Sequence, residues 1–212
     1  MKLPTHLRSA AAALALAASA LPAAAQVYVL DATDVANFGA APYGTVTLTQ
    51  NGANVDVQVD LRGDLNFLTT GGHNVFSFNG LDMVVGDIVN IHDASTQTFS
   101  AVVPGTNPPF GSFDFGIVCA TGCSNGGSAG GYPDPLTFTV NNASVGDFVD
   151  LSSGGSLGQA YFAADVLVTS GPNLGATGAV GAITAVPEPE TYALMLAGIG
   201  MMGFMARRRR PA

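Results

Sequence analysis

The sequence predicts an all-β body, a β-sandwich or jelly-roll-like fold, flanked by an N-terminal signal peptide and a C-terminal transmembrane helix. Three observations support this prediction. Apolar and polar residues alternate in the clearest segments, Gly, Pro, Asn and Asp clusters separate short apolar runs, and no segment between Gln26 and Val186 has a helical period of useful length. The chain has 212 residues, 48% of them hydrophobic, which suits one domain plus flanking segments.

The first 25 residues are typical of a signal peptide. Lys2 and Arg8 provide a positive start, an Ala- and Leu-rich run follows, and Ala23 and Ala25 form a small-residue cleavage site. Cleavage by signal peptidase after Ala25 would leave Gln26 as the first residue. We therefore expect an exported protein.

A hairpin is the clearest element of the predicted body, residues 26–168. The segments "TVTLT" and "VDVQVDL" alternate strictly and flank "QNGAN", whose Asn51-Gly52 pair favours a tight turn. Their polar residues share one face: Thr45, Thr47, Thr49, Asp56, Gln58 and Asp60. Further strands are expected over Val75 to Phe78, Ile88 to Ile91, Thr98 to Val103, Ser112 to Val118, Leu136 to Val140, Phe148 to Leu151 and Tyr161 to Val168.

A short motif, V-G-D followed by an apolar residue and Val, occurs at Val85 and again at Val145. A strand, a turn with Gly before Asp, and a second strand would produce it. Equivalent hairpins in two halves of a sandwich, or a generic turn used twice, both explain the repeat.

The body is strongly acidic. Between Gln26 and Val186 it contains 13 Asp, no Glu and one Arg, a formal net charge of −12. Phosphate backbones and anionic lipids would repel it, so nucleic acid is excluded as a partner, and cations and neutral polymers remain. Calcium-binding candidates near predicted turns are Asp82, Asp87, Asp147 and Asp150, although turn formation and solubility explain the same residues. We expect no other cofactor.

Two cysteines, Cys119 and Cys123, lie four positions apart in "CATGC". In an exported chain they are expected to form a disulfide, with Gly122 allowing the tight turn. Two free thiols that bind a metal are the alternative.

No catalytic motif is evident in the body. Two G-x-S-x-G matches, at residues 126–130 and 154–158, lack the following helix that a hydrolase nucleophile needs. We therefore expect the body to be non-enzymatic.

Small, uncharged and turn-forming residues fill positions 169–185, which predicts a linker. An apolar helix over residues 192–206 would be about 22 Å long, shorter than the roughly 30 Å hydrocarbon core. Local thinning and snorkelling can accommodate such a span. A cluster of four arginines is expected to stop translocation at the cytoplasmic face: Arg207, Arg208, Arg209 and Arg210.

Pro187, Glu188 and Pro189 precede this helix and arginine cluster. In this order, residues 186–210 resemble the PEP-CTERM sorting signal, also catalogued as the ice-binding protein C-terminal domain. The resemblance implies bacterial export, recognition by a membrane enzyme called exosortase, and removal of the helix near the motif. The precursor would be anchored in the inner membrane by the helix, and the mature form would reach the cell surface or extracellular matrix.

Two classes of function remain for the body. The first is a non-enzymatic cell-envelope or extracellular-matrix protein associated with a biofilm or with exopolysaccharide. The second is a carbohydrate-binding module or a glycan-processing enzyme with the same tail. A cleft with paired carboxylates would favour the second class.

Overall fold

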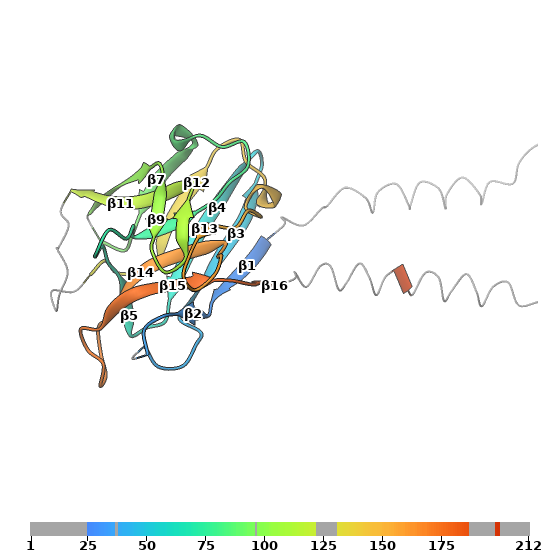
Figure 1. The fold of residues 1–212 in the computed structure, drawn as a ribbon. Coiled ribbons are helices and arrows are strands. Elements are labelled where there is room, and N and C mark those ends of the chain that lie inside the picture. The colour runs from blue at the N-terminus through green and yellow to red at the C-terminus, as the bar shows by residue number, and fades with distance from the viewer. Residues whose placement is uncertain (1–24, 37, 96, 122–130, 187–197, 200–212) are drawn as a thin grey trace, which may run out of the picture.

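The computed structural model describes residues 25–36, 38–95, 97–121, 131–186 and 198–199 (Figure 1). Strands form about half of this part of the chain, joined by loops and by two short 3-10 helices, η1 (Val85–Asp87) and η2 (Val145–Asp147). The all-β prediction is confirmed. No helix in the described part of the chain is long and apolar enough to cross a membrane.

The first sheet has six strands and antiparallel pairing throughout. Its order is β16 (Ala185–Val186), β1 (Ala25–Leu30), β3 (Gly44–Asn51), β4 (Asn54–Leu61), β12 (Leu136–Val140) and β7 (Ile88–His92). The predicted hairpin is β3 and β4, with Asn51 opposite Asn54. Its two loop residues are Gly52 and Ala53, and Gly52 has the positive φ of 62° that a tight hairpin turn requires.

The second sheet follows the order β2 (Ala32–Thr33), β15 (Thr177–Ala182), β14 (Phe162–Val168), β6 (Phe76–Phe78), β11 (Phe115–Thr121) and β8 (Thr98–Val102). An additional strand, β5 (Leu65–Phe67), pairs with the C-terminal half of β14. A third, small sheet contains β13 (Ser153–Gly154), β10 (Gly111–Phe113) and β9 (Gly105–Asn107).

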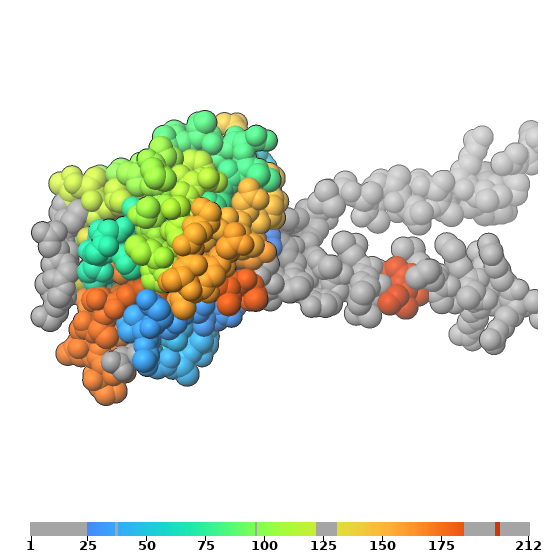
Figure 2. Space-filling model, in the orientation of Figure 1, coloured from blue at the N-terminus to red at the C-terminus, as the bar shows by residue number. Residues whose placement is uncertain are grey.

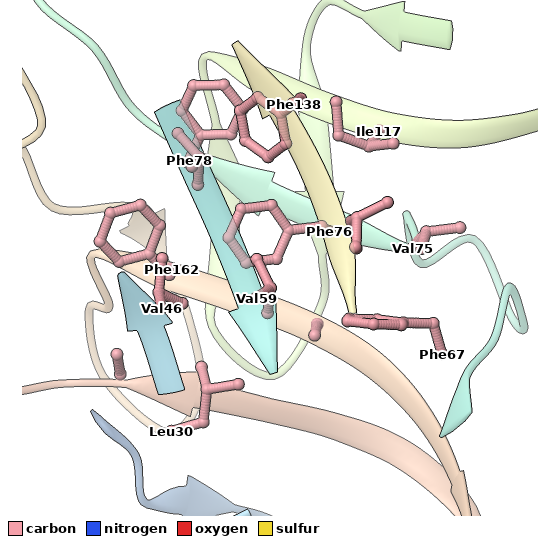
Figure 3. Close-up of a cluster of buried hydrophobic side chains, with 14 of the residues drawn as sticks. Leu30, Val46, Val59, Phe67, Val75, Phe76, Phe78, Ile117, Phe138 and Phe162 are labelled. Atoms are coloured by element: carbon pink, nitrogen blue, oxygen red, sulfur yellow. The ribbon is translucent and has the colours of Figure 1, made fainter. Parts of the chain in front are cut away.

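The two large sheets share one hydrophobic core. Phe138 of the first sheet lies 5.3 Å from Phe78 and 6.0 Å from Phe76 of the second, measured between ring centroids. Tyr28 meets Phe162 edge-on at 4.7 Å. Figure 3 shows these phenylalanines between the two layers, beside aliphatic residues such as Val59. Such packing is the main source of stability for sheets with one apolar face.

The outer face of the second sheet is also covered. Phe110, next to β10, packs with Phe113 onto Ala163 of β14 and Ala179 of β15 in a separate apolar cluster. Every residue of β14 is consequently buried. The small sheet thus makes this side of the body three layers deep.

Two predicted segments are corrected. Residues 169–185 are not a linker, because they include β15, in which Ala179, Val180 and Ala182 are fully buried. The body therefore extends to Val186 instead of ending at residue 168. Residues 148–151 form no strand, and only Phe148 of this segment reaches the core, directly after η2.

Candidate functional site

Asp87 and Asp147, two of the calcium candidates, stabilise turns. Oδ2 of Asp87 accepts a hydrogen bond from the Val84 N–H at 3.0 Å, and Oδ2 of Asp147 accepts one from the Ser144 N–H at 2.7 Å. Each aspartate is the third residue of its 3-10 helix. The repeated V-G-D motif is therefore a capped turn used twice, as side chains that bond the first backbone N–H groups of a helix stabilise it.

The other two calcium candidates do not complete a metal cluster. Asp82 occupies an exposed turn with φ of 55°, and Asp150 is exposed in the loop before β13. Among the residues that the structure describes, no group of three or more His, Cys, Asp or Glu side chains could hold a metal ion. The calcium prediction gains no support from a shared ligand set.

Asp150 instead lines a polar cleft of about 500 Å³, which we call the aspartate cleft. Its walls come from the small sheet and the loops beside it: Asn79, Ser112, Phe113, Asp114, Asp150, Leu151, Ser153 and Gln159. Ser112 pairs with Ser153 across β10 and β13. Figure 2 shows the segment around residues 105–115 beside the segment around residues 150–160 on the surface.

Asn79 fixes the two aspartates of the cleft. Its side chain is 5% exposed, and its amide group is used on both sides. Oδ1 accepts a hydrogen bond from the Asp114 N–H at 2.7 Å, and Nδ2 donates one to the Asp150 carbonyl oxygen at 3.3 Å. One buried amide thus connects two loops that are 36 positions apart in the sequence, and orders the backbone that carries both carboxylates.

The aspartate cleft adjoins an apolar groove of about 670 Å³, and the two hollows share Phe113 and Asp114. Exposed valines form part of the groove, with Val84 62% exposed and Val103 57% exposed. Polar and apolar surfaces therefore meet where these two hollows join. The sequence offered no signal for this site, because Asp114 and Asn79 belong to no recognisable motif.

A second polar surface lies on the outer face of the first sheet. Thr47, Thr49, Thr137 and Thr139 line a hollow of about 320 Å³ there. Its one carboxylate, Asp56, is engaged on both oxygens: Oδ1 accepts from the Thr139 hydroxyl at 2.8 Å and Oδ2 from Nδ2 of Asn51 at 2.8 Å. The polar face predicted from alternation is thus present, and its hydrogen bonds are largely internal.

Asp165 is the one aspartate of the described residues that is fully buried. Burial raises the pKa of its carboxyl group to about 6, although hydrogen bonds from Thr70 act in the opposite direction. The Thr70 N–H and hydroxyl donate to Oδ2 at 2.6 and 2.8 Å. Nδ1 of His73 lies 3.7 Å from Oδ1, and burial lowers the pKa of this histidine.

Most predicted processing residues lie outside the described part of the chain: Ala23, Cys123, Pro187, Glu188, Pro189, Arg207, Arg208, Arg209 and Arg210. The predicted helix over residues 192–206 does too, apart from Gly198 and Ile199. Ala25 is the first residue of β1, and Cys119 lies in β11. The cleavage site and the disulfide stay predictions.

The strands next to the two flanking segments are paired with each other. Val27 and Tyr28 of β1 lie opposite Val186 and Ala185 of β16, at the edge of the first sheet. Figure 1 shows β1 and β16 side by side. Since β16 ends at Val186, the residue before Pro187, the folded body extends directly to the predicted processing motif.

The comparison with protein families gives one result. Residues 185–210 match the model of the PEP-CTERM protein-sorting motif, and of the β-rich body this match covers β16 alone. The chain has no significant match among curated proteins or among solved structures. The chain is therefore a protein that carries a PEP-CTERM sorting motif, which implies export and recognition by an exosortase-type enzyme.

Proposed function

We propose that this protein is a non-enzymatic component of the cell envelope or extracellular matrix, associated with a biofilm or exopolysaccharide. The observation that carries the proposal is the sorting motif over residues 185–210. The precursor would be held in the inner membrane by the tail helix, and the mature body would reach the surface or the matrix. Signal peptidase and an exosortase-type enzyme would act on the two ends.

The use of the carboxylates supports a non-enzymatic body. Asp87 and Asp147 cap turns, and Asp56 accepts two hydrogen bonds on the outer sheet face. Asp64 is paired with Arg62, whose guanidinium group lowers the pKa of that carboxyl. Side chains that are committed to internal bonds are poorly placed to act as general acids or bases.

The position of the chain ends supports processing near the body. Both flanking segments connect to the edge formed by β1 and β16. Proline at residues 187 and 189 cannot donate a backbone hydrogen bond, so the pairing of β16 cannot continue regularly through the motif. A strand that ends before the motif would favour access by an enzyme.

Intact-mass analysis of the protein in a host with and without an exosortase tests this proposal. We expect the mature mass to lack the tail helix only when the enzyme is present. Replacing Pro187 and Pro189 with Ala should leave the precursor inserted, while Pro172→Ala, a proline outside the motif, should be processed normally. A tail that is retained in both hosts would contradict sorting and leave a plain membrane anchor.

The second candidate is a carbohydrate-binding module or glycan-processing enzyme with the same tail. The aspartate cleft favours it, because two carboxylates in one cleft are the groups that glycan hydrolysis uses. Release of reducing ends from an oligosaccharide, lost in Asp114→Asn, would establish the enzyme and overturn the non-enzymatic proposal.

A further inference from the structure

We propose that the aspartate cleft binds a neutral oligosaccharide, with Asp114 and Asp150 accepting hydrogen bonds from its hydroxyl groups. The inference deepens one part of the proposed function, the association with an exopolysaccharide, by naming the ligand of the body. It rests on that function only because an exported body meets extracellular polymers. Binding itself can be measured independently of export.

The polar groups of the cleft have unused hydrogen-bonding capacity. Within the described residues, no hydrogen bond engages the carboxylate of Asp150 or the hydroxyls of Ser112 and Ser153. The Asp114 carboxylate accepts only a long bond, from the Gly80 N–H at 3.4 Å. Asp56, by contrast, accepts bonds on both oxygens, and Asp87 and Asp147 each accept a shorter bond, at 3.0 and 2.7 Å, that caps a turn. The cleft therefore offers acceptors and hydroxyls to a ligand.

The backbone of the cleft is ordered before any ligand arrives. The Asn79 amide holds the Asp114 and Asp150 backbones, and Nε2 of Gln159 donates to the Ser152 carbonyl oxygen at 2.7 Å. The buried Ser152 hydroxyl donates in turn to the Phe110 carbonyl oxygen at 2.5 Å. Because these loops are fixed by buried bonds, little conformational entropy is lost when a ligand binds.

Apolar side chains at the cleft and in the groove beside it could contact the C–H faces of a sugar ring. Leu151, 41% exposed, is the apolar side chain that the cleft presents, while Phe113 beside it is 3% exposed; the adjoining groove is lined by Val84, Val103 and neighbouring residues. A pyranose ring presents hydroxyls at its edge and C–H groups on its faces, so it needs both kinds of surface. A cleft of about 500 Å³ lies in the range of small-molecule sites. The adjoining groove extends it for a chain of several sugars.

The negative charge of the cleft favours a neutral oligosaccharide over an acidic one. Two carboxylates line the cleft, no basic residue does, and the body carries a formal charge of −12. A uronic acid or sulfated polymer would be repelled, whereas hydroxyl donors would meet strong acceptors.

Isothermal titration of the full chain tests the proposal, in a detergent without a sugar headgroup and with EDTA present. The probes are neutral hexasaccharides of glucose, mannose and galactose, with hexagalacturonate as the anionic comparison. We expect at least one neutral hexasaccharide to bind with Kd of about 1 mM or tighter, and hexagalacturonate to bind at least about tenfold more weakly.

Variants locate the binding. Asp114→Asn and Asp150→Asn should each weaken it by about tenfold or more, since charge-assisted hydrogen bonds are lost. Asp60→Asn, on the outer face of the first sheet, is the matched control and should bind normally. Thermal denaturation of each variant checks the fold, which these exposed side chains should not alter.

Three results would overturn the proposal: no neutral hexasaccharide binds with or without Ca²⁺, both cleft variants bind like the unaltered protein, or binding appears only when Ca²⁺ replaces the EDTA. The third result would mean that the two carboxylates hold an ion. A failure of tail processing, by contrast, would contradict the proposed function and leave the binding result intact.

Discussion

Two pairs of neighbouring strands show how differently the two sides of the body are built. The hairpin β3 and β4 has one face in the core and one in solvent, and its residues alternate accordingly. In contrast, β14 is buried on both faces, because the core lies on one side and the Phe110 cluster on the other. A strand with both faces covered loses its alternation.

The neighbouring strand β15 shows the same effect through glycine. A Cβ atom added at Gly181 would lie 2.7 Å from the Phe110 ring, and one at Gly178 would lie 2.3 Å from Cγ2 of Val35. Small residues therefore mark close packing here, and not a flexible connection. A segment of small residues such as β15 can therefore be a closely packed strand, in which glycine leaves room for side chains of the layer above it.

The largest expected effect on stability is that of replacing Asp165 in β14, with Asp56 in β4 as the aspartate to compare. Asp165→Asn should raise the free energy of unfolding at pH 7 by about 3 kcal/mol, because a pKa of about 6 against 3.8 penalises the charged folded form. The folded state holds this proton more tightly, so the stabilisation is complete below about pH 4 and is lost as pH rises through about 6.

Urea denaturation from pH 4 to pH 7 measures this effect as the difference between the variant and the unaltered protein. The difference should grow across this range, and Asp56→Asn, on the solvent face of the first sheet, is the matched comparison from the other region. A pH-independent difference for Asp165→Asn would contradict a buried, titrating carboxyl group.

The next largest effect concerns glycine in β15. Gly181→Val should lower the free energy of unfolding by about 2 kcal/mol, because its side chain would overlap the Phe110 ring. In a protein that already carries Phe110→Ala, Gly181→Val should lower the free energy of unfolding by less than it does in the unaltered protein. Substitutions of residues in contact are not additive. Thermal denaturation of the single and double variants checks this. Strict additivity would show that Phe110 does not cover β15.

The smallest effect is expected on the solvent face of the hairpin. Thr47→Ala should change the free energy of unfolding by no more than about 0.5 kcal/mol, since Thr47 is a partly exposed side chain in an already paired strand. Chemical denaturation provides the measurement. A loss above about 2 kcal/mol would mean that this face is buried and that the two strand pairs do not differ as described.

Local pattern accounts for what could be predicted. The alternation around Val46 and Val57 gave the hairpin, and the spacing of Gly and Asp near Val85 and Val145 gave the repeated turn. The tail was recognisable because its features follow one another in the chain. β15 was missed because its burial depends on Phe110, which is some 70 positions away and contributes nothing to the local pattern.

The aspartate cleft could not be predicted for a related reason. Asp114 and Asp150 come from separate loops, and the connection between them is made by Asn79 through backbone groups. Neither aspartate has a neighbour in the sequence that indicates a shared site. Only Asp150 was singled out, as a calcium candidate, without its partner.

The pairing of β1 with β16 has a mechanical consequence. Because the strands are antiparallel and both outward connections leave from the same end of the pair, a pulling force between them acts on one rung at a time. Tyr28 and Ala185 separate only after Val27 and Val186. A load on a tethered body would thus peel a two-residue edge strand first, and the force needed would be set by individual backbone hydrogen bonds while the aromatic core stays intact.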